Sequence, residues 1–331
     1  MAKTSSIRLA GMFGPWGIAL QGIQKSLAMN GIESDFLSGQ DVVSSMLQLE
    51  KDEKSLDVGN SSRFDEAGLQ LLDSGVADVG VNFREQAEWA YRGLFHQESQ
   101  PHTNLRAIAR LMQPQYVGFA ATYESGITSL EQVARERRPI RLLTISRSKS
   151  QTRFMGYVHT RVLEESGFTQ AHVIEWGGKV FTAEDGIRAI LEEDVDVIGL
   201  SCYGNWGAIW GDMWMHAQIR LNLRFLPIAE TVRDALAQEL GIQKGLMPAQ
   251  MLRGVDTDVP TFAMRDHTVT TSTALSDEKA FQIARAIDEH PSCLQEGAVA
   301  FSYSPRTGTN GLGMPMHPGA EAYYRTQGYL D

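Results

Sequence analysis

The chain has 331 residues, of which 43% are hydrophobic and 21% charged, and a formal net charge of −10 at pH 7. This length predicts about two domains, and the composition is that of a folded globular protein rather than a disordered chain. The acidic balance, with no long run of Lys and Arg, argues against a nucleic-acid-binding surface. Two cysteines cannot build a disulfide framework. No Cys/His cluster has zinc-site spacing, so neither a metal nor another cofactor is expected.

The sequence also shows no segment that would carry the chain to a membrane. No apolar run reaches the ~18 residues that a membrane-spanning helix needs. Lys3 precedes an apolar stretch, but Phe13–Gly17 interrupts it and no small-residue cleavage site follows. The sequence as it stands therefore predicts a cytoplasmic protein without a signal peptide.

Apolar periodicity in the first third of the chain alternates between the strand and helix patterns. The chain opens with a short apolar strand, which is followed by glycines and Pro15 and then by apolar residues at helical spacing. Pro15 suits the first turn of that helix. The expected strands are residues 6–10, 32–37, 76–82, 105–112 and 116–122, and the expected helices are 18–29, 41–54, 64–72 and 84–91. This alternation is typical of an α/β sheet.

The same alternation starts again in the rest of the chain, with no low-complexity linker and no clear internal repeat. The expected helices are 129–138, 154–166, 183–191, 206–219, 229–240 and 277–288, and the expected strands are 140–145, 172–176, 195–200, 223–228 and 261–272. The second α/β set looks inserted into the first. We therefore predict lobe 1 from residues 1–120 plus 255–331 and lobe 2 from residues 121–254.

The most distinctive stretch lies near the end of the chain. Pro315 and Pro318 bracket a lone histidine, His317, and a helical pattern with a Tyr-Tyr pair follows. Because proline fixes φ and cannot donate to a ladder, an ordered turn leading into a helix is expected here. The segment resembles the Pro-x-His-Pro-Gly-Ala…Tyr-Tyr ending of the TAXI family, the solute receptors of a class of TRAP transporters. Weaker similarities occur in the same order at 78–82, 90–93, 105–109 and 124–130.

This resemblance implies a two-lobed fold like that of type II periplasmic binding proteins, with a ligand cleft between the lobes. It implies a solute-binding protein that closes its lobes around a small organic anion, such as an aromatic or amino acid carboxylate. It also implies a periplasmic location and a TRAP-type membrane permease as partner. The alternative is a cytoplasmic enzyme on the same fold, such as a decarboxylase of a small carboxylic acid.

Ligands of open α/β sheets bind beyond the carboxyl ends of strands, near helix N-termini, and two early loops meet this condition. In the loop at residues 11–17, Phe13, Gly14 and Trp16 are candidate ligand contacts, although a tight turn with a core tryptophan is an equal reading. Asn82 and Arg84 directly follow a buried strand, and an arginine can pair bidentately with a carboxylate. Asn82 could instead only cap the next helix.

Two later loops offer further candidates. The loop at residues 146–153 combines hydroxyls, cations and free N–H groups at a helix N-terminus, where anions bind, but a solvated polar loop is the alternative. The loop at 201–206 follows a buried strand and leads into a helix that has a tryptophan every four residues. Such a row of tryptophans on one helix face more often serves packing than ligand binding. The candidates from these loops, with the strand-end Trp176, are Ser146, Arg147, Ser148, Thr152, Arg153, Trp176, Cys202, Tyr203, Asn205 and Trp206.

No spacing of ionisable residues in the sequence identifies a catalytic site. Cys202 would be a nucleophile only if a neighbour lowered its pKa, and an inert buried thiol is the favoured reading. His317 could titrate near neutral pH, but a hydrogen-bonding role in the turn is favoured. These two are the only, and weak, catalytic candidates for the enzyme alternative.

Overall fold

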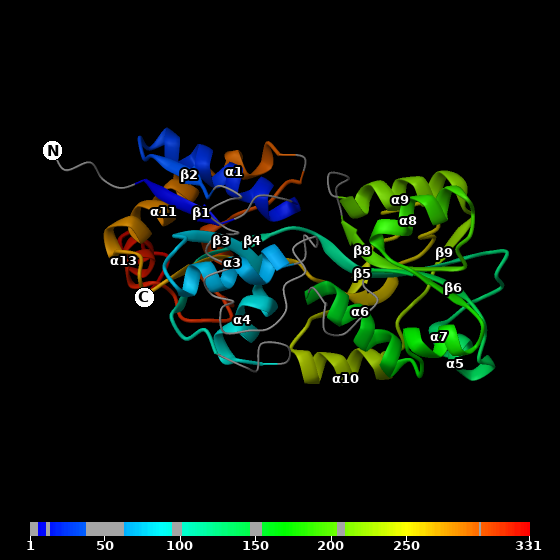
Figure 1. Ribbon diagram of the computed structural model, residues 1–331. Helices are drawn as coiled ribbons and strands as arrows, with labels where there is room; N and C mark the ends of the chain where they lie inside the picture. Colours follow the sequence, from blue (N-terminus) through cyan, green and yellow to red (C-terminus); the bar gives the residue numbers. More distant parts are fainter. Residues whose placement is uncertain are drawn as a thin grey trace. The chain divides into compact units, whose positions relative to one another are not determined.

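The computed structural model describes residues 6–10, 14–37, 63–94, 101–145, 154–203, 209–297 and 299–331. The chain divides into two compact units, Met1–Gln113 with Asp266–Asp331, and Pro114–Arg265 (Figure 1). Each unit has its own five-stranded sheet with helices. The predicted α/β class with two units is therefore confirmed.

The sheet of the first unit has the strand order β2-β1-β3-β12-β4. Strand β1 pairs in parallel with β2 and β3, whereas β12, which returns after the second unit, is antiparallel to β3 and β4. The elements of this unit are β1 (Ile7–Ala10), α1 (Gly14–Met29), β2 (Ser34–Phe36), α3 (Arg63–Asp73), β3 (Val79–Phe83), α4 (Arg84–Arg92), β4 (Leu105–Met112), β12 (Asp266–Ser272), α11 (Asp277–Glu289), the 3-10 helix η4 (Pro291–Gln295), α12 (Pro305–Gly308) and α13 (Pro318–Thr326).

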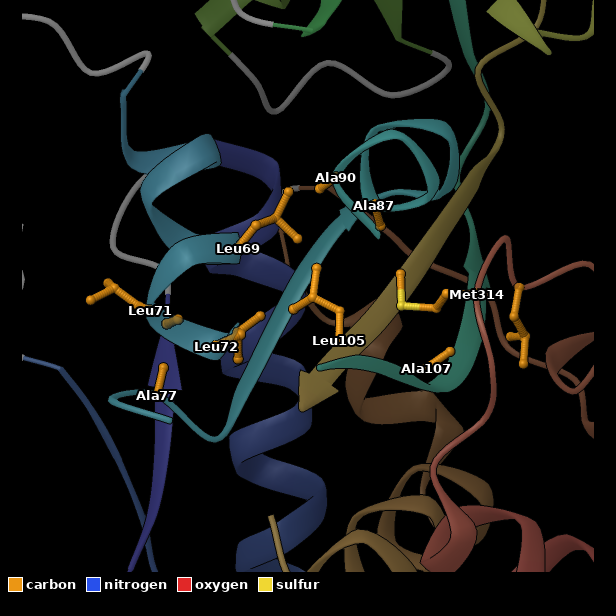
Figure 2. Close-up of a cluster of buried hydrophobic side chains, with 11 residues drawn as sticks. Leu69, Leu71, Leu72, Ala77, Ala87, Ala90, Leu105, Ala107 and Met314 are labelled. Atoms are coloured by element: carbon orange, nitrogen blue, oxygen red, sulfur yellow. The ribbon is translucent and has the colours of Figure 1, made fainter. Parts of the chain in front are cut away.

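One hydrophobic cluster of this unit joins α3, α4, β4 and the C-terminal turn (Figure 2). Leucines of α3 meet alanines of α4 and β4, and the small alanines let the elements approach closely. Its buried members are Ala10, Leu69, Leu71, Leu72, Ala77, Ala87, Ala90, Leu105, Ala107, Leu312 and Met314. The distinctive C-terminal stretch thus contributes to the core of the first unit.

The sheet of the second unit has the order β7-β6-β8-β5-β9, and β10 and β11 form a separate antiparallel pair. Strand β6 is parallel to β7 and β8, and β5 is antiparallel to β8 and β9. The elements are β5 (Gln115–Thr122), α5 (Leu130–Glu136), β6 (Arg141–Thr144), α6 (Phe154–Glu165), α7 (Gln170–Glu175), β7 (Lys179–Phe181), α8 (Ala183–Leu191), β8 (Val197–Tyr203), α9 (Ile209–Arg220), β9 (Leu223–Phe225), α10 (Glu230–Leu240), β10 (Lys244–Met247) and β11 (Val259–Phe262).

The two sheets repeat one topology, which the sequence did not reveal. In each sheet, an arginine at the start of the second strand in the order, Arg8 in β1 or Arg141 in β6, binds an aspartate that directly precedes the third strand. The backbone N–H of Arg8 donates to Asp78 Oδ2 at 2.8 Å, and its Nη2 donates to Oδ1 at 2.7 Å. Arg141 makes the same bonds to Asp196, at 2.8 and 2.6 Å. The carboxylates Asp78 and Asp196, which the sequence left without a role, tie neighbouring strands together.

We expect Asp196→Ala to lower the free energy of unfolding by about 2 kcal/mol, because it removes charge-assisted bonds to both the N–H and the guanidinium of Arg141. Urea unfolding measures the change. Glu321→Ala is the control, since its ion pair with Arg325 is exposed and should contribute less than about 0.5 kcal/mol. Equal losses in the two variants would contradict the structural role of the clamp.

The predicted strand at 172–176 is wrong, because these residues lie in α7 and its C-terminal cap. Thr169 Oγ1 accepts the N–H of His172 at 3.1 Å, and His172 Nδ1 accepts the N–H of Thr169 at 3.3 Å. This reciprocal capping box starts a helix, and it outweighs the strand propensity of Val173 and Ile174. The edge strand is instead β7, which begins at Lys179.

Two other predicted strands have different limits. The strand expected at 195–200 continues to Tyr203, so Ser201, Cys202 and Tyr203 are strand residues and not part of a loop. The single strand expected at 261–272 is two strands, β11 and β12, which belong to different units. Residues 41–54, predicted as a helix, lie outside the described residues.

Candidate functional site

Asn82, near the end of β3, and Arg84, the first residue of α4, lie at the carboxyl edge of the first unit's sheet. Strand β3 is buried along its whole length, and helix α4 begins directly after it, at Arg84. The N-cap residue, Phe83, provides no side-chain hydrogen bond to the first turn. The side chain before α4 therefore does not cap its first turn, and the N-terminus of a helix favours an anion.

Arg84 is held in place by carboxylates of its own helix. Its Nη2 lies 2.9 Å from Glu85 Oε1, and its Nη1 lies 3.0 Å from Glu88 Oε2. Burial lowers the pKa of Arg84, but the charges of Glu85 and Glu88 outweigh it, so that the pKa is raised. Arg84 is thus a fixed cation at the start of α4.

Glu85 is almost completely buried, and burial raises the pKa of its carboxyl group in spite of the opposing effect of Arg84. Its Oε2 has no hydrogen-bond partner among the described residues. A second ion pair lies at the same edge, because Asp266 begins β12 and its Oδ2 is 3.5 Å from Arg110 Nη1. This edge therefore combines two guanidinium groups with several carboxyl groups.

The carboxyl edge of the second unit's sheet is formed by the ends of β6 and β8 and by the start of the antiparallel strand β5. Tyr203, the last residue of β8, lies opposite Gln115, the first residue of β5. Both side chains are buried. The sequence predicted Tyr203 as a ligand contact and overlooked Gln115.

Cys202 faces the other side of this sheet, toward α9. A Cβ placed on Gly118 would lie 2.2 Å from Cys202 Sγ and 3.3 Å from Trp214 Cζ2. The thiol is fully buried, and burial raises its pKa well above the usual value. Since the thiolate is the nucleophilic form, this environment keeps the thiol unreactive.

Trp214 and Trp176 of the second unit serve packing. Trp214 is buried, donates from Nε1 to the carbonyl oxygen of Ser201 at 3.0 Å, and packs 5.0 Å from the ring of Phe225. Trp176 ends α7 and stacks on His172 at 5.5 Å. Because it precedes β7, Trp176 lies at the amino edge of the sheet and is not brought together with Tyr203.

His317 caps helix α13 in the first unit. Its Nε2 donates to the carbonyl oxygen of Leu275 at 3.0 Å, and its Nδ1 accepts the N–H of Gly319 at 3.2 Å. The ring is buried, and burial lowers its pKa. Both nitrogens are therefore occupied by the backbone, which is the hydrogen-bonding role expected from the sequence.

The remaining sequence candidates are not placed by the structure. Gly14 begins α1, but nothing can be said of the side chain of Trp16. Outside the described residues lie Phe13, Ser146, Arg147, Ser148, Thr152, Arg153, Asn205 and Trp206.

Three buried polar side chains of the second unit were missed by the sequence reasoning: Gln115, Ser201 and His159. Gln115 begins the otherwise apolar strand β5, Ser201 interrupts the apolar strand β8, and His159 lies on the buried face of α6. A polar residue inside an apolar strand is the signal that could have identified Ser201. Burial lowers the pKa of His159 to about 4.

No group of three His, Cys, Asp or Glu side chains is arranged to hold a metal ion in the part of the chain that the structure describes. None of the helices within the described ranges is both long and apolar enough to span a bilayer.

A family model, the NMT1-like family, matches residues 44–328, which is most of the chain. Among solved structures, a TctC solute binding protein from Polaromonas shares 10% identity over 100% of both chains, with a TM-score of 0.47. PhnD1 from Prochlorococcus marinus, in complex with methylphosphonate, shares 10% identity over 98% of this chain and 99% of its own, with a TM-score of 0.46. A marine metagenome TRAP solute binding protein specific for pyroglutamate shares 12% identity over 97% and 91%, with a TM-score of 0.41. These likenesses are too distant to carry an argument about what this chain binds.

Proposed function

Because this chain belongs to the NMT1-like family, we propose that it is a solute-binding protein, of the TAXI type that its C-terminal motif resembles. Its solute is a small organic anion, and the two units act as lobes that close on it. The observation that carries the proposal is the start of α4, where the N-cap side chain of Phe83 makes no hydrogen bond to the first turn and Arg84 is held by two carboxylates. A carboxylate is the group that such an arrangement recognises.

Closure of two lobes about their connecting segments is the mechanism of this proposal. A solute that contacts both lobes stabilises the closed state by its differential affinity for it. No bond of the solute needs to be broken. In this proposal the protein works in the periplasm and delivers its solute to a TRAP-type permease.

One observation favours the enzyme alternative. Glu85 is a buried carboxyl group beside Arg84, and burial raises its pKa; a raised pKa suits a carboxyl group to the role of general acid. In this reading, Arg84 binds the carboxylate of a small acid, and Glu85 supplies the proton that replaces carbon dioxide in a decarboxylation. Cys202 and His317 have no part in it, since both are sequestered.

A thermal-shift screen of small carboxylic acids tests the proposal. A solute at 100 times its Kd stabilises the folded state by about 2.7 kcal/mol, which raises Tm by several degrees. We expect Arg84→Gln to weaken the binding of an acid found in this way by roughly 10- to 100-fold, the effect of one charged hydrogen bond. Arg188→Gln, which changes an exposed arginine paired with Asp185, should bind as the wild type does.

Two results would overturn the proposal in different ways. If no acid stabilises the protein, or if Arg84→Gln and Arg188→Gln bind equally well, the start of α4 is not an anion site. If an acid binds but is converted on incubation, and Glu85→Gln stops the conversion, the protein is an enzyme. Recovery of the unchanged acid supports the solute-binding function.

A further inference from the structure

Three fully buried side chains of the second unit have hydrogen-bonding atoms without a partner among the described residues. They are Oε1 and Nε2 of Gln115, Oγ of Ser201 and Nε2 of His159. His159 Nδ1 lies 2.7 Å from the carbonyl oxygen of Met155 and donates to it, so Nε2 of the neutral ring is an acceptor. The carbonyl group of Leu200 also lies beside the ring and raises its pKa, against the larger effect of burial. A buried polar group without a partner destabilises a fold, and each case requires a physical reason.

The strand register places these side chains on one face of the sheet. Gln115 lies opposite Tyr203, and Val117 lies opposite Ser201. Side chains directly opposite in an antiparallel pair project to the same face, and so do residues two apart along one strand. Gln115, Ser201 and Tyr203 therefore share a face.

His159 belongs to the same face, which α6 covers. Its ring lies 5.4 Å from the ring of Phe119, which is on the same face as Gln115 because it is four residues further along β5. Figure 1 shows α6 on one side of this sheet and α8 and α9 on the other. The polar side chains thus form a strip that begins at the carboxyl edge, at Gln115, and leads inward past Ser201 to His159.

The strip offers only uncharged donors and acceptors. Gln115 supplies a donor and an acceptor, Ser201 supplies either, and neutral His159 supplies an acceptor. No ion pair or hydrogen bond connects the three to a Lys, Arg, Asp or Glu within the described ranges. Among the described residues, a carboxylate or an ammonium group placed here finds no counter-charge, and burial without one is costly. A hydroxyl or a carboxamide group, which both donates and accepts, matches all three.

We propose that Gln115 and Ser201 form a subsite for an uncharged hydroxyl or carboxamide group of the solute, with His159 as the acceptor at its inner end. The inference rests on the proposed function and narrows it. The solute is a hydroxy acid or an acid amide rather than a plain carboxylic acid. Its carboxylate belongs to a charged site elsewhere, and its uncharged group belongs to this strip.

Matched pairs of acids test the subsite by calorimetric titration and thermal shift. The pairs are malate and succinate, lactate and propionate, and glutamine and norvaline, in which the first member carries the extra hydroxyl or carboxamide group. We expect the wild type to bind the first member of at least one pair about tenfold more tightly, which corresponds to one hydrogen bond between neutral groups. Gln115→Met and Ser201→Ala should reduce this preference to about one.

The same variants should raise the Tm of the protein without solute, because each removes a buried polar group that has no partner. Thr261→Val is the control. The Thr261 hydroxyl is equally buried but donates to the carbonyl oxygen of Val117, so its loss should lower Tm and leave the preference unchanged. Opposite signs of the Tm change therefore distinguish a ligand subsite from a structural hydrogen bond.

Each remaining outcome decides against the subsite. A preference that persists in both variants, or a lower Tm in both without solute, overturns the inference while the proposed function stands. The inference is also overturned if the wild type binds the acids without any preference for those that carry the extra hydroxyl or carboxamide group. If no acid of the panel binds to the wild type, the proposed function fails and the subsite fails with it.

Discussion

Gly319→Ala is expected to lower the free energy of unfolding by about 3 kcal/mol or more. A Cβ at this position would lie 2.0 Å from the carbonyl oxygen of Asp277 and 2.7 Å from its Cα. These are backbone atoms at the start of α11, so no rotation of a side chain can relieve the contact. Helix α13 would have to move away from α11 and lose its packing, which places the change among the most costly core substitutions.

Gly68→Ala is the matched control for this prediction. Gly68 lies in helix α3, and a Cβ there has nothing within 4 Å. Alanine is a better helix former than glycine, so this variant should gain about 0.5–1 kcal/mol. Urea unfolding of both variants measures the two effects, and a Gly319→Ala protein as stable as Gly68→Ala would contradict the close packing of α13 on α11.

The close approach at Gly319 accounts for the glycine in the C-terminal stretch that resembles the TAXI family. The N–H of His317 donates to the carbonyl oxygen of Ala107 at 2.9 Å, and the N–H of Ala107 donates to that of Pro315 at 3.0 Å. The imidazole then fixes the start of α13 and the turn before α11. Pro315, His317 and Gly319 of the motif thus have structural roles in the first unit.

Most strands and helices could be predicted from the sequence because apolar residues recur with the period of each element. The prediction failed where a short local signal opposed that period. At residues 169–172 the capping box uses His172 in the position where Glu or Gln is usual. The helix α7 was therefore read as a strand from its aliphatic residues alone.

Candidate site residues could be predicted from the sequence only where they directly follow a parallel strand. Asn82 and Arg84 follow a parallel strand, so the rule that ligands bind at carboxyl ends leads to them directly. Gln115 is the first residue of a strand, whereas this rule concerns residues that follow a strand. Only the antiparallel direction of β5 brings it to the carboxyl edge beside Tyr203, and this direction depends on contacts between segments far apart in the sequence.

The stability of the protein is expected to fall as the pH falls from 6.5 to 4, with about 3 kcal/mol of the loss due to His159. Burial lowers the pKa of this residue from 6.5 to about 4. Below pH 6.5 the unfolded chain takes up a proton that the folded chain does not, so unfolding becomes more favourable. The contribution is fully present above pH 6.5 and is lost as the pH falls through 4, and a shift of this size corresponds to about 3 kcal/mol.

Urea unfolding between pH 4 and 8 measures this dependence. His159→Leu removes the titrating group, so its unfolding free energy should decline less steeply toward pH 4 than that of the wild type. The decline should be reduced rather than abolished, because burial also lowers the pKa of His317, which acts in the same direction. If His159→Leu keeps the wild-type profile, the imidazole of His159 is not held in its neutral form by the core between α6 and the sheet.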